Sequence, residues 1–459
     1  MTELSEKFLV DSNNKAFDKK HRNTINFNIS KYDFAVANGK KQYSDIELAR
    51  ERAAVIKRKV VNNLEDYLIN FEANCIKNGG KVIWAENVED VHREIAKIVQ
   101  KYQAKKVVKS KSMTTEEIKL NEFLEKNGIE SIETDLGEYI QQVDNEPPYH
   151  IVTPAMHKSK QDVVELFNKK FGLPLDSTAE QMTHFVRDKI KKDFLEAKIG
   201  ITGGNFLLAD TGSICITENE GNASMAMAHP DVHVAIVGIE KLLPSINDLN
   251  LFWPLLSTFG TGQKATVYNS IISGPKKEGE VDGPKEFIVI LLDNGRTNLL
   301  AQPKQRAALS CIRCGACLNA CPVYKNVGGH TYNATYTGPI GSVISPHLNS
   351  MEDYKHLSYS SSLCGKCTEV CPVKIDIHNQ LLNNRRDAVS NGITESGDNF
   401  SMNLWKKGMM SRKLLNIPNA TIKNMVFKYL FSKQWGPRRD NITFPKETFN
   451  DWWKKNKAN

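Results

Sequence analysis

The first 300 residues alternate between apolar patterns with helical period and short apolar runs typical of strands. Between Asp45 and Asn78 apolar residues recur at helical spacing and stop at Gly79-Gly80, which predicts one long amphipathic helix. Strands are expected at residues 81–85, 106–109, 130–134 and 149–152, and helices at 88–102, 116–127, 159–171 and 178–197. Because strands that alternate with helices usually pair in parallel, the pattern predicts a parallel sheet.

The alternation continues through residues 200–292. Glycines divide residues 200–216 into turn, strand, turn and strand, further strands are expected at 232–237, 265–272 and 287–292, and residues 242–256 are mainly helical. We therefore predict an α/β domain over residues 46–300, preceded by a polar N-terminal arm over residues 1–45 with one or two helical pieces. Residues 260–265 fit the spacing of a dinucleotide fingerprint, but a strand-like segment follows them where that fingerprint requires a helix. No nicotinamide or flavin site is therefore visible.

Seven of the nine cysteines lie in two short runs, Cys311-x-x-Cys314-x-x-Cys317-x-x-x-Cys321-Pro322 and Cys364-x-x-Cys367-x-x-x-Cys371-Pro372. In two-cluster ferredoxins the first three cysteines of such a run bind one cluster, and the fourth ligates the other. We therefore expect two 4Fe-4S clusters. The first has the ligands Cys311, Cys314, Cys317 and Cys371, and the second has Cys321, Cys364 and Cys367. A zinc ribbon is the alternative, although zinc has no use for the third cysteine of the first run.

The second run is one cysteine short. Aligning the two Cys-Pro pairs places Ser361 opposite Cys311, and a serine oxygen suits cluster iron poorly. Either the fourth iron of the second cluster stays open to water, another side chain or a partner, or residues 323–363 supply a donor, with His330, His347 and His356 as candidates. The remaining histidines are dispersed and are interpreted as core or surface residues: His150, His157, His184, His229 and His233.

Composition and charge limit the class of protein and the places where it could act. The chain has 459 residues, of which 40% are hydrophobic and 25% charged, which is typical of soluble globular domains. The N-terminus lacks a secretory pattern and no apolar run approaches the roughly 20 residues of a membrane span, so we expect a cytoplasmic protein without a transmembrane segment. Residues 402–459 hold thirteen Lys and Arg against three Asp and Glu. This basic tail is interpreted as a solvated face or a partner surface, and we expect no nucleic-acid binding.

The whole layout resembles the lactate utilization protein B family, the iron–sulfur subunit of a bacterial three-protein L-lactate oxidation system. The resemblance rests on Lys109 to Ile118, Ala209-Asp210-Thr211-Gly212-Ser213, Asn219-Glu220-Gly221-Asn222, Asp293-Asn294-Gly295-Arg296 and both cysteine runs. It implies a CoA-transferase-like α/β domain, an α-helical ferredoxin-type domain at 301–390 and a basic C-terminal tail at 391–459. It also implies oxidation of lactate to pyruvate together with two partner subunits and an unidentified electron acceptor.

The α/β domain offers further candidate residues. Lys109, Lys111 and Ser112 follow a strand, where open parallel sheets place ligand sites, and the lysines could hold a carboxylate or phosphate unless they are only solvated. Gly203, Gly204 and Asn205 either shape a neighbouring backbone pocket or form a plain turn. Kinship with CoA transferases makes Glu218 and Glu220 candidate nucleophiles. Three functions remain open: an electron-transfer subunit, an acyl- or CoA-transferring enzyme with accessory clusters, and a nucleic-acid-binding regulator.

Overall fold

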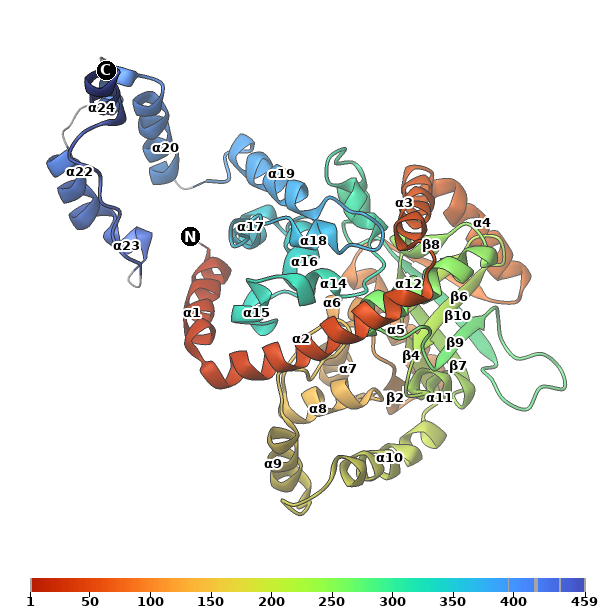
Figure 1. Ribbon diagram of the computed structural model, residues 1–459. Coiled ribbons are helices and arrows are strands. Elements are labelled where there is room, and N and C mark those ends of the chain that lie inside the picture. Colours follow the sequence, from red (N-terminus) through yellow and green to blue (C-terminus); the bar gives the residue numbers. More distant parts are fainter. Residues whose placement is uncertain (1, 395, 417–419, 437–438, 458–459) are drawn as a thin grey trace. The chain divides into compact units, whose positions relative to one another are not determined.

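A six-stranded parallel sheet forms the centre of the computed structural model, which describes residues 2–394, 396–416, 420–436 and 439–457 (Figure 1). Its strand order is β1-β10-β7-β4-β2-β3. The bounds are Lys81–Ala85 for β1, Lys106–Lys109 for β2, Glu130–Glu133 for β3, Ile199–Thr202 for β4, Val232–Gly238 for β7 and Glu286–Leu292 for β10. The predicted parallel sheet is confirmed, because every pairing between neighbouring strands is parallel.

Helices and a second sheet cover the two faces of this sheet. The helices α5 (Val88–Tyr102) and α7 (Leu120–Lys126) pack on one face. The opposite face is covered by α4 (Leu64–Lys77), α11 (Asn222–Ala228) and a smaller sheet of order β8-β5-β6-β9. That smaller sheet comprises β5 (Phe206–Leu208), β6 (Ser213–Glu218), β8 (Leu242–Leu243) and β9 (Tyr268–Ile272). Helices α8 (Leu136–Asp144), α9 (Lys160–Phe171) and α10 (Ala179–Glu196) extend the core beside β2 and β3.

The strand order reverses between β2 and β4. From β2 the chain passes through α6 (Met113–Glu117) and α7 to the edge strand β3, whereas from β4 it proceeds through α11 to β7 and later to β10. Since α7 and α11 lie on opposite faces, the chain continues from β2 and from β4 toward opposite faces of the sheet. Ligand sites of open α/β sheets form in the crevice at such a reversal, outside the carboxyl ends of the strands.

Several predicted elements were wrong. The helix expected over 116–127 is interrupted by Lys119, which has φ 50°, and the turn expected at residue 200 is part of strand β4. The long helix over 45–78 is two helices, α3 (Ile46–Asn62) and α4, because Asn63 leaves helical geometry with φ −130° and its side-chain amide donates to the carbonyl of Lys59. Residues 149–152 form no strand, because Nδ1 of His150 accepts from the backbone amides of Val152 and Thr153. Helix α12 (Leu249–Thr261) starts later than residue 242, because Pro244 disfavours helix before it.

The glycines of the rejected dinucleotide fingerprint have a packing role. Gly262 caps the C-terminus of α12 with φ 78°, and a Cβ atom there would lie 2.3 Å from the backbone carbon of Ala35. Ala35 belongs to α2 (Lys19–Gly39), the long helix that crosses α12 (Figure 1). The glycine therefore permits this close helix crossing.

The cysteine runs lie among short helices that share one core with the N-terminal arm and α12. The arm consists of α1 (Glu3–Phe17) and α2, whose Phe8, Ile25 and Ile29 are buried in that core. The helices around the cysteines are α13 (Arg296–Leu300), α14 (Ala316–Ala320), α15 (Tyr324–Val327), α16 (Gly338–Leu348), α17 (Met351–Tyr359), α18 (Lys366–Glu369) and α19 (Ile377–Ser390). The α-helical part expected after the sheet is confirmed.

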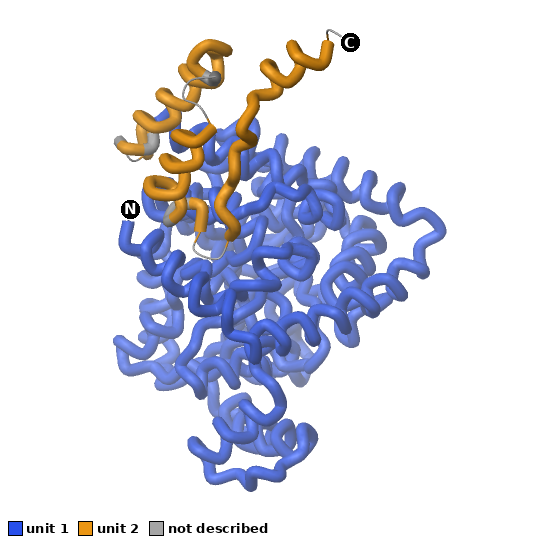
Figure 2. Tube along the Cα trace, turned by 60° about the vertical axis from the view of Figure 1, so that its left-hand side comes forward, with its two compact units in different colours: residues 1–391 blue, residues 392–459 orange. Residues whose placement is uncertain are grey.

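Two compact units divide the chain, residues 1–391 and residues 392–459 (Figure 2). The second unit contains α20 (Ser396–Met409), α21 (Arg412–Asn416), α22 (Ala420–Val426), α23 (Ser432–Trp435) and α24 (Phe449–Asn456). Arg438 of the basic tail lies outside the described residues. None of the helices in the described ranges is both long enough and apolar enough to cross a membrane.

Candidate functional site

The seven clustered cysteines form two groups in space. Cys311, Cys314, Cys317 and Cys371 line one small cavity, whose other walls are mostly apolar. The second group consists of Cys321, Cys364 and Cys367. Burial raises the pKa of the Cys367 thiol to about 11, and the neighbouring Cys321 and Cys364 add to this increase. Each group therefore combines residues from both runs, in the crossed arrangement expected from the spacing.

Two turns of matching backbone present these side chains. In the first turn Arg313 has φ 60° and its amide donates to Sγ of Cys311 at 3.3 Å. In the second turn Leu363 has φ 55° and its amide donates to Oγ of Ser361 at 3.1 Å. In both turns the glycine before the following helix, α14 or α18, also has positive φ. Ser361 thus occupies the structural position of Cys311, as the alignment of the runs implies.

The surroundings of the first cysteine group favour binding of positively charged iron. Burial, reinforced by the neighbouring thiols, raises the pKa values of Cys314 and Cys317, so these side chains become thiolates only when a cation compensates their charge. Amides partly oppose this effect: that of Ile375 donates to Sγ of Cys371 at 3.3 Å. The Nε and Nη1 atoms of Arg313 are buried and find no partner in the described part of the chain, so they are available to sulfur acceptors.

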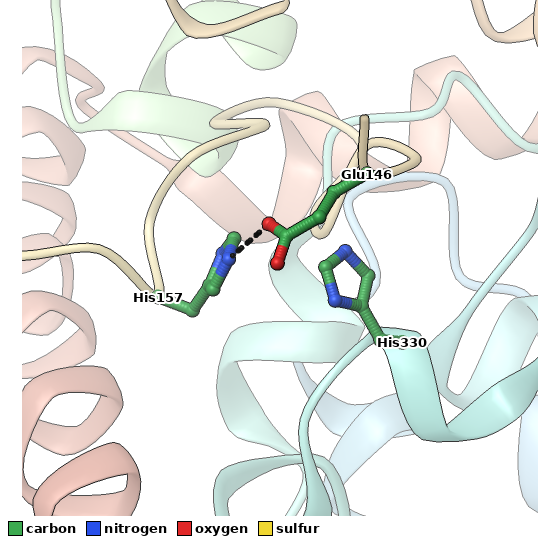
Figure 3. Close-up of side chains that lie close together, drawn as sticks. All are labelled: Glu146, His157 and His330. Atoms are coloured by element: carbon green, nitrogen blue, oxygen red, sulfur yellow. Dashed lines mark hydrogen bonds and ion pairs between the residues drawn. The ribbon is translucent and has the colours of Figure 1, made fainter. Parts of the chain in front are cut away.

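The histidines considered as a fourth donor for the second group have other neighbours. Nε2 of His347 lies 3.0 Å from Oδ1 of Asn384, and the ring of His356 packs 5.2 Å from that of Phe8. His330 lies near Glu146 and His157, where its Nε2 donates to the carbonyl of Pro147 at 2.8 Å (Figure 3). His330 and His347 thus hydrogen-bond to groups other than the cysteine sulfurs, whereas both ring nitrogens of His356 are buried without a hydrogen-bond partner in the described part of the chain.

Glu146, His157 and His330 have the composition of a metal site, and each of them already makes a hydrogen bond to the protein, although Nδ1 of His157 is buried without a partner among the described residues. Oε2 of Glu146 accepts from Nε2 of His157 at 3.0 Å (Figure 3). The same oxygen pairs with the ammonium of Lys158 at 2.9 Å. These hydrogen bonds and ion pairs lower the pKa of Glu146 to about 2, with the His157 contact as the largest cause. The cluster therefore connects the loop after α8 to the cysteine-bearing part.

A pocket of about 380 Å³ opens at the carboxyl ends of β2, β3, β4 and β7, where the strand order reverses. It is lined by seven of the eight α/β residues singled out in the sequence: Lys111, Ser112, Gly203, Gly204, Asn205, Glu218 and Glu220. The loops after β2 and β4 touch here, because a Cβ atom on Gly203 would lie 2.6 Å from Oγ of Ser112. Glycine at this position is therefore required by the close approach of the two loops.

The two candidate glutamates differ. Glu218 stabilises the first turn of α11, since its carboxylate accepts from the amides of Ala223 at 2.7 Å and Ser224 at 2.9 Å, and from the Ser224 hydroxyl. It is committed to that structural role. Glu220 accepts from the amide of Leu136 at 3.0 Å, and burial together with the charge of Asp135 raises its pKa to about 7. Glu220 is thus the candidate whose carboxyl can exchange a proton near neutral pH.

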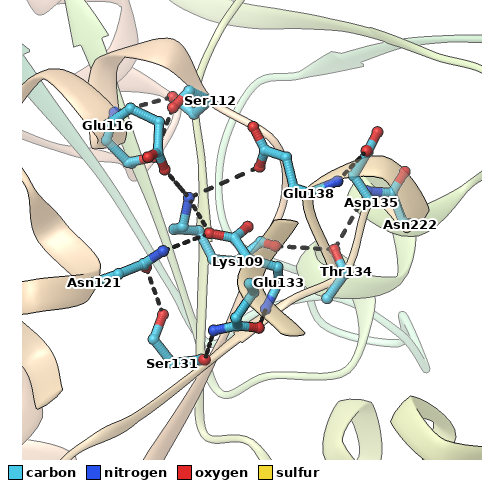
Figure 4. Close-up of polar contacts among 12 residues, drawn as sticks. Lys109, Ser112, Glu116, Asn121, Ser131, Glu133, Thr134, Asp135, Glu138 and Asn222 are labelled. Atoms are coloured by element: carbon cyan, nitrogen blue, oxygen red, sulfur yellow. Dashed lines mark hydrogen bonds and ion pairs between the residues drawn. The ribbon is translucent and has the colours of Figure 1, made fainter. Parts of the chain in front are cut away.

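Lys109, the eighth candidate, is buried away from the pocket. Its ammonium contacts Glu133 at 2.7 Å and Glu116 at 3.1 Å, and Glu138 lies 4.0 Å away (Figure 4). Although burial opposes the charged form, Glu133 and the other two carboxylates raise the pKa of Lys109. Burial and the charge of Glu133 raise the pKa of Glu138 above its ordinary value. Lys109 therefore stabilises the fold and does not reach a ligand in the pocket.

Sequence reasoning missed the wall that joins the pocket to the first cysteine group. Lys241, which follows β7, and Arg313 and Cys314 of the first cysteine run all line the pocket. The ring of Tyr336 lies 4.4 Å from the Arg313 guanidinium and completes this wall. The available signal was the position of Lys241 just beyond the carboxyl end of a strand, the same signal that identified Lys111.

A buried ionic network stabilises this wall. Arg296 binds Oε2 of Glu240 at 2.6 Å and Oε2 of Glu117 at 2.8 Å, and Arg313 reaches Oε1 of Glu240 at 3.3 Å. The Tyr336 hydroxyl donates to Glu117 at 2.7 Å. Because buried carboxylates need such partners, the network fixes the cysteine-bearing part against the sheet.

Comparisons with known proteins agree with both parts of the chain. Residues 68–292 match the LUD domain family, and residues 307–375 match the 4Fe-4S dicluster domain, a family of iron–sulfur cluster domains. Lactate utilization protein B of Bacillus cytotoxicus is 43% identical over 419 residues, which cover 89% of this chain and 88% of that protein. Lactate utilization protein B 2 of Bacillus mycoides has the same identity and coverage.

Two further similarities complete the comparison. The uncharacterized electron transport protein YkgF of Escherichia coli is 42% identical, with 89% of this chain and 88% of that protein covered. A crystal structure of a duf162 family protein from Deinococcus radiodurans is 12% identical and covers 50% of this chain and 98% of its own, with a TM-score of 0.29.

Proposed function

This chain belongs to the lactate utilization protein B family, and we propose that it is the iron–sulfur electron-transfer subunit of a cytoplasmic system that oxidises L-lactate to pyruvate. The observation that carries the proposal is the convergence of seven cysteines into two groups within a region that matches a 4Fe-4S dicluster domain. Relatives named for lactate utilization along 89% of the chain support the pathway assignment.

We assign one 4Fe-4S cluster to each cysteine group. Cys311, Cys314, Cys317 and Cys371 hold the first cluster, and Cys321, Cys364 and Cys367 hold the second. When bound, such clusters exchange single electrons, whereas oxidation of a hydroxy acid removes two. The residues of this chain enclose the first site and bring Cys364 of the second site to the surface. We infer two partner subunits and an external electron acceptor, with the basic tail as a partner surface.

The test is anaerobic reduction of the cluster-loaded full-length chain by L-lactate. The reduction is measured as a change in the visible absorbance of the clusters. We expect bleaching when the two other lactate-utilization proteins of the same organism are added and none with this chain alone. Bleaching should require L-lactate, so D-lactate is the matched control. Lactate oxidation by the isolated chain, or intact absorbance in the presence of both partners, would contradict the proposal.

A further inference from the structure

Lys241 is a buried cation in an open pocket. Its exposed fraction is 9%, it lines the pocket of about 380 Å³, and its Nζ has no hydrogen bond or ion pair within the described ranges. A buried ammonium without a counterion is unfavourable, because desolvation is not repaid. The absence of a protein partner therefore makes this ammonium available to an anion that enters the pocket.

The charges around Lys241 strengthen this argument. Three buried cations, Lys241, Arg296 and Arg313, face two carboxylates, Glu117 and Glu240. Arg296 binds both carboxylates, Arg313 shares Glu240, and the buried ammonium of Lys57 donates to the Glu240 carbonyl, so the buried cations outnumber the carboxylates in this network. Low solvent access strengthens the attraction between the Lys241 ammonium and an anion.

The shape of the pocket determines the ligand class. Its volume of about 380 Å³ lies in the range of small-molecule and cofactor sites, roughly 300–1,000 Å³. Ser112, Asn205 and Thr217 add polar groups to a wall that includes the apolar side chains of Val152 and Leu256. The lining combines the cations Lys111, Lys241 and Arg313 with the carboxylates of Asp135, Glu218 and Glu220 and with apolar side chains, and this mixture suits an organic molecule with one anionic group rather than an inorganic ion.

We propose that this pocket binds an organic anion whose carboxylate or phosphate contacts Lys241, next to the first cysteine group. Cys314 lines the same pocket, so the bound molecule lies beside a cluster ligand. The proposal does not rest on the electron-transfer function, since anion binding can be measured whether or not lactate reduces the protein.

Binding to the cluster-loaded full-length chain tests the proposal by anaerobic calorimetry with L-lactate, pyruvate and flavin mononucleotide. The first two probes represent small carboxylates and the third a phosphate-bearing cofactor, so the three arms distinguish the source of the anionic group. We expect saturable binding of at least one probe, and a change in the paramagnetic signal of the reduced first cluster when that probe binds. No saturable binding of any of the three would overturn the proposal.

Substitutions locate the binding site. Lys241→Met keeps most of the side-chain length but removes the charge, and it should weaken the affinity at least about 10-fold, as expected for loss of a charge-assisted hydrogen bond. Lys241→Arg should restore most of the affinity. The matched control is Lys198→Met, which removes one charge next to the amino end of β4, the opposite edge of the sheet.

Circular dichroism melting of each variant verifies folding. Lys241 has a competing role, which is to compensate the charge of the first cluster only. In that case Lys241→Met would shift the reduction potential of the cluster while the probe affinity stayed unchanged. An unchanged affinity in a folded Lys241→Met protein would overturn the proposal.

Discussion

The two cysteine turns share a backbone but differ in their surroundings. The first turn contributes to a group of four thiols, of which Cys314, Cys317 and Cys371 are buried, and it borders the pocket at the sheet. The second turn contributes to a group of three thiols, of which Cys364 is exposed. The two runs therefore share the backbone of the turn, whereas burial and the number of thiols distinguish an enclosed group from an open one.

The turn that contains Ser361 shows how the second group comes to have one thiol fewer than the first. Ser361 keeps the hydrogen bond from the amide two residues later that Cys311 makes, so the turn retains its geometry without its thiol. Arg385 also donates to the Ser361 carbonyl at 3.0 Å, which stabilises the turn from α19. A turn preserved in this way is consistent with a second site that lacks one protein sulfur.

The largest effect is expected from removing a thiol of the enclosed group. Cys317→Ser should lower the iron content from about eight to about four atoms per chain, because a buried cube needs all its thiolates. Iron and sulfide analysis after anaerobic purification measures the loss. Cys215→Ala, which changes a buried cysteine in β6, should keep the full iron content. Equal iron in the Cys317→Ser protein would show that the first group does not hold a cluster.

A smaller effect is expected at the open group. Gentle oxidation of the wild-type chain should release about one of about eight irons and produce a three-iron paramagnetic signal, because one iron lacks a thiolate. Ser361→Cys should suppress this loss, since residue 361 occupies the position of Cys311. Ser360→Cys, one residue away, is the matched control and should not suppress it. Oxidation that leaves both wild-type clusters intact would instead indicate a fixed fourth donor.

The two cysteine groups could be predicted because most of their members lie close together in the sequence. Within each run the cysteines are three or four residues apart, so one turn and one short helix bring them together. The crossed position of Cys371 in the first group follows from the same pattern. The exposure of Cys364 could not be predicted, because it depends on packing against distant segments.

The pocket was predictable only in part. Lys111, Ser112, Gly203 and Glu220 follow strands, and the carboxyl ends of parallel strands meet at one edge. The direction of an individual side chain depends on the layers that cover each face, which no local pattern specifies, and Lys109 accordingly lies in a buried ion cluster. The prediction of a strand at 149–152 was wrong for a related reason, because side-chain hydrogen bonds form a turn within an apolar segment.

The smallest effect is expected from a charge that lies beside only one of the two groups. The charge of Cys311 is the largest attraction that holds the pKa of Arg313 above its ordinary value against burial, and no comparable cation contacts the open group through its equivalent residue, Leu363. Arg313→Met should therefore lower the reduction potential of the first cluster by tens of millivolts, because a nearby positive charge favours the added electron. Anaerobic redox titration monitored by paramagnetic resonance measures both clusters.

Each sample contains its own control, because the potential of the second cluster should stay unchanged while that of the first falls. Arg313→Lys retains the charge and should keep most of the wild-type potential, although Lys cannot reproduce the stacking of the guanidinium 4.4 Å from Tyr336. Equal shifts at both clusters would mean that Arg313 acts through the general packing of the region. A shift confined to the first cluster would instead establish that the enclosed site is tuned by the residue that also lines the pocket.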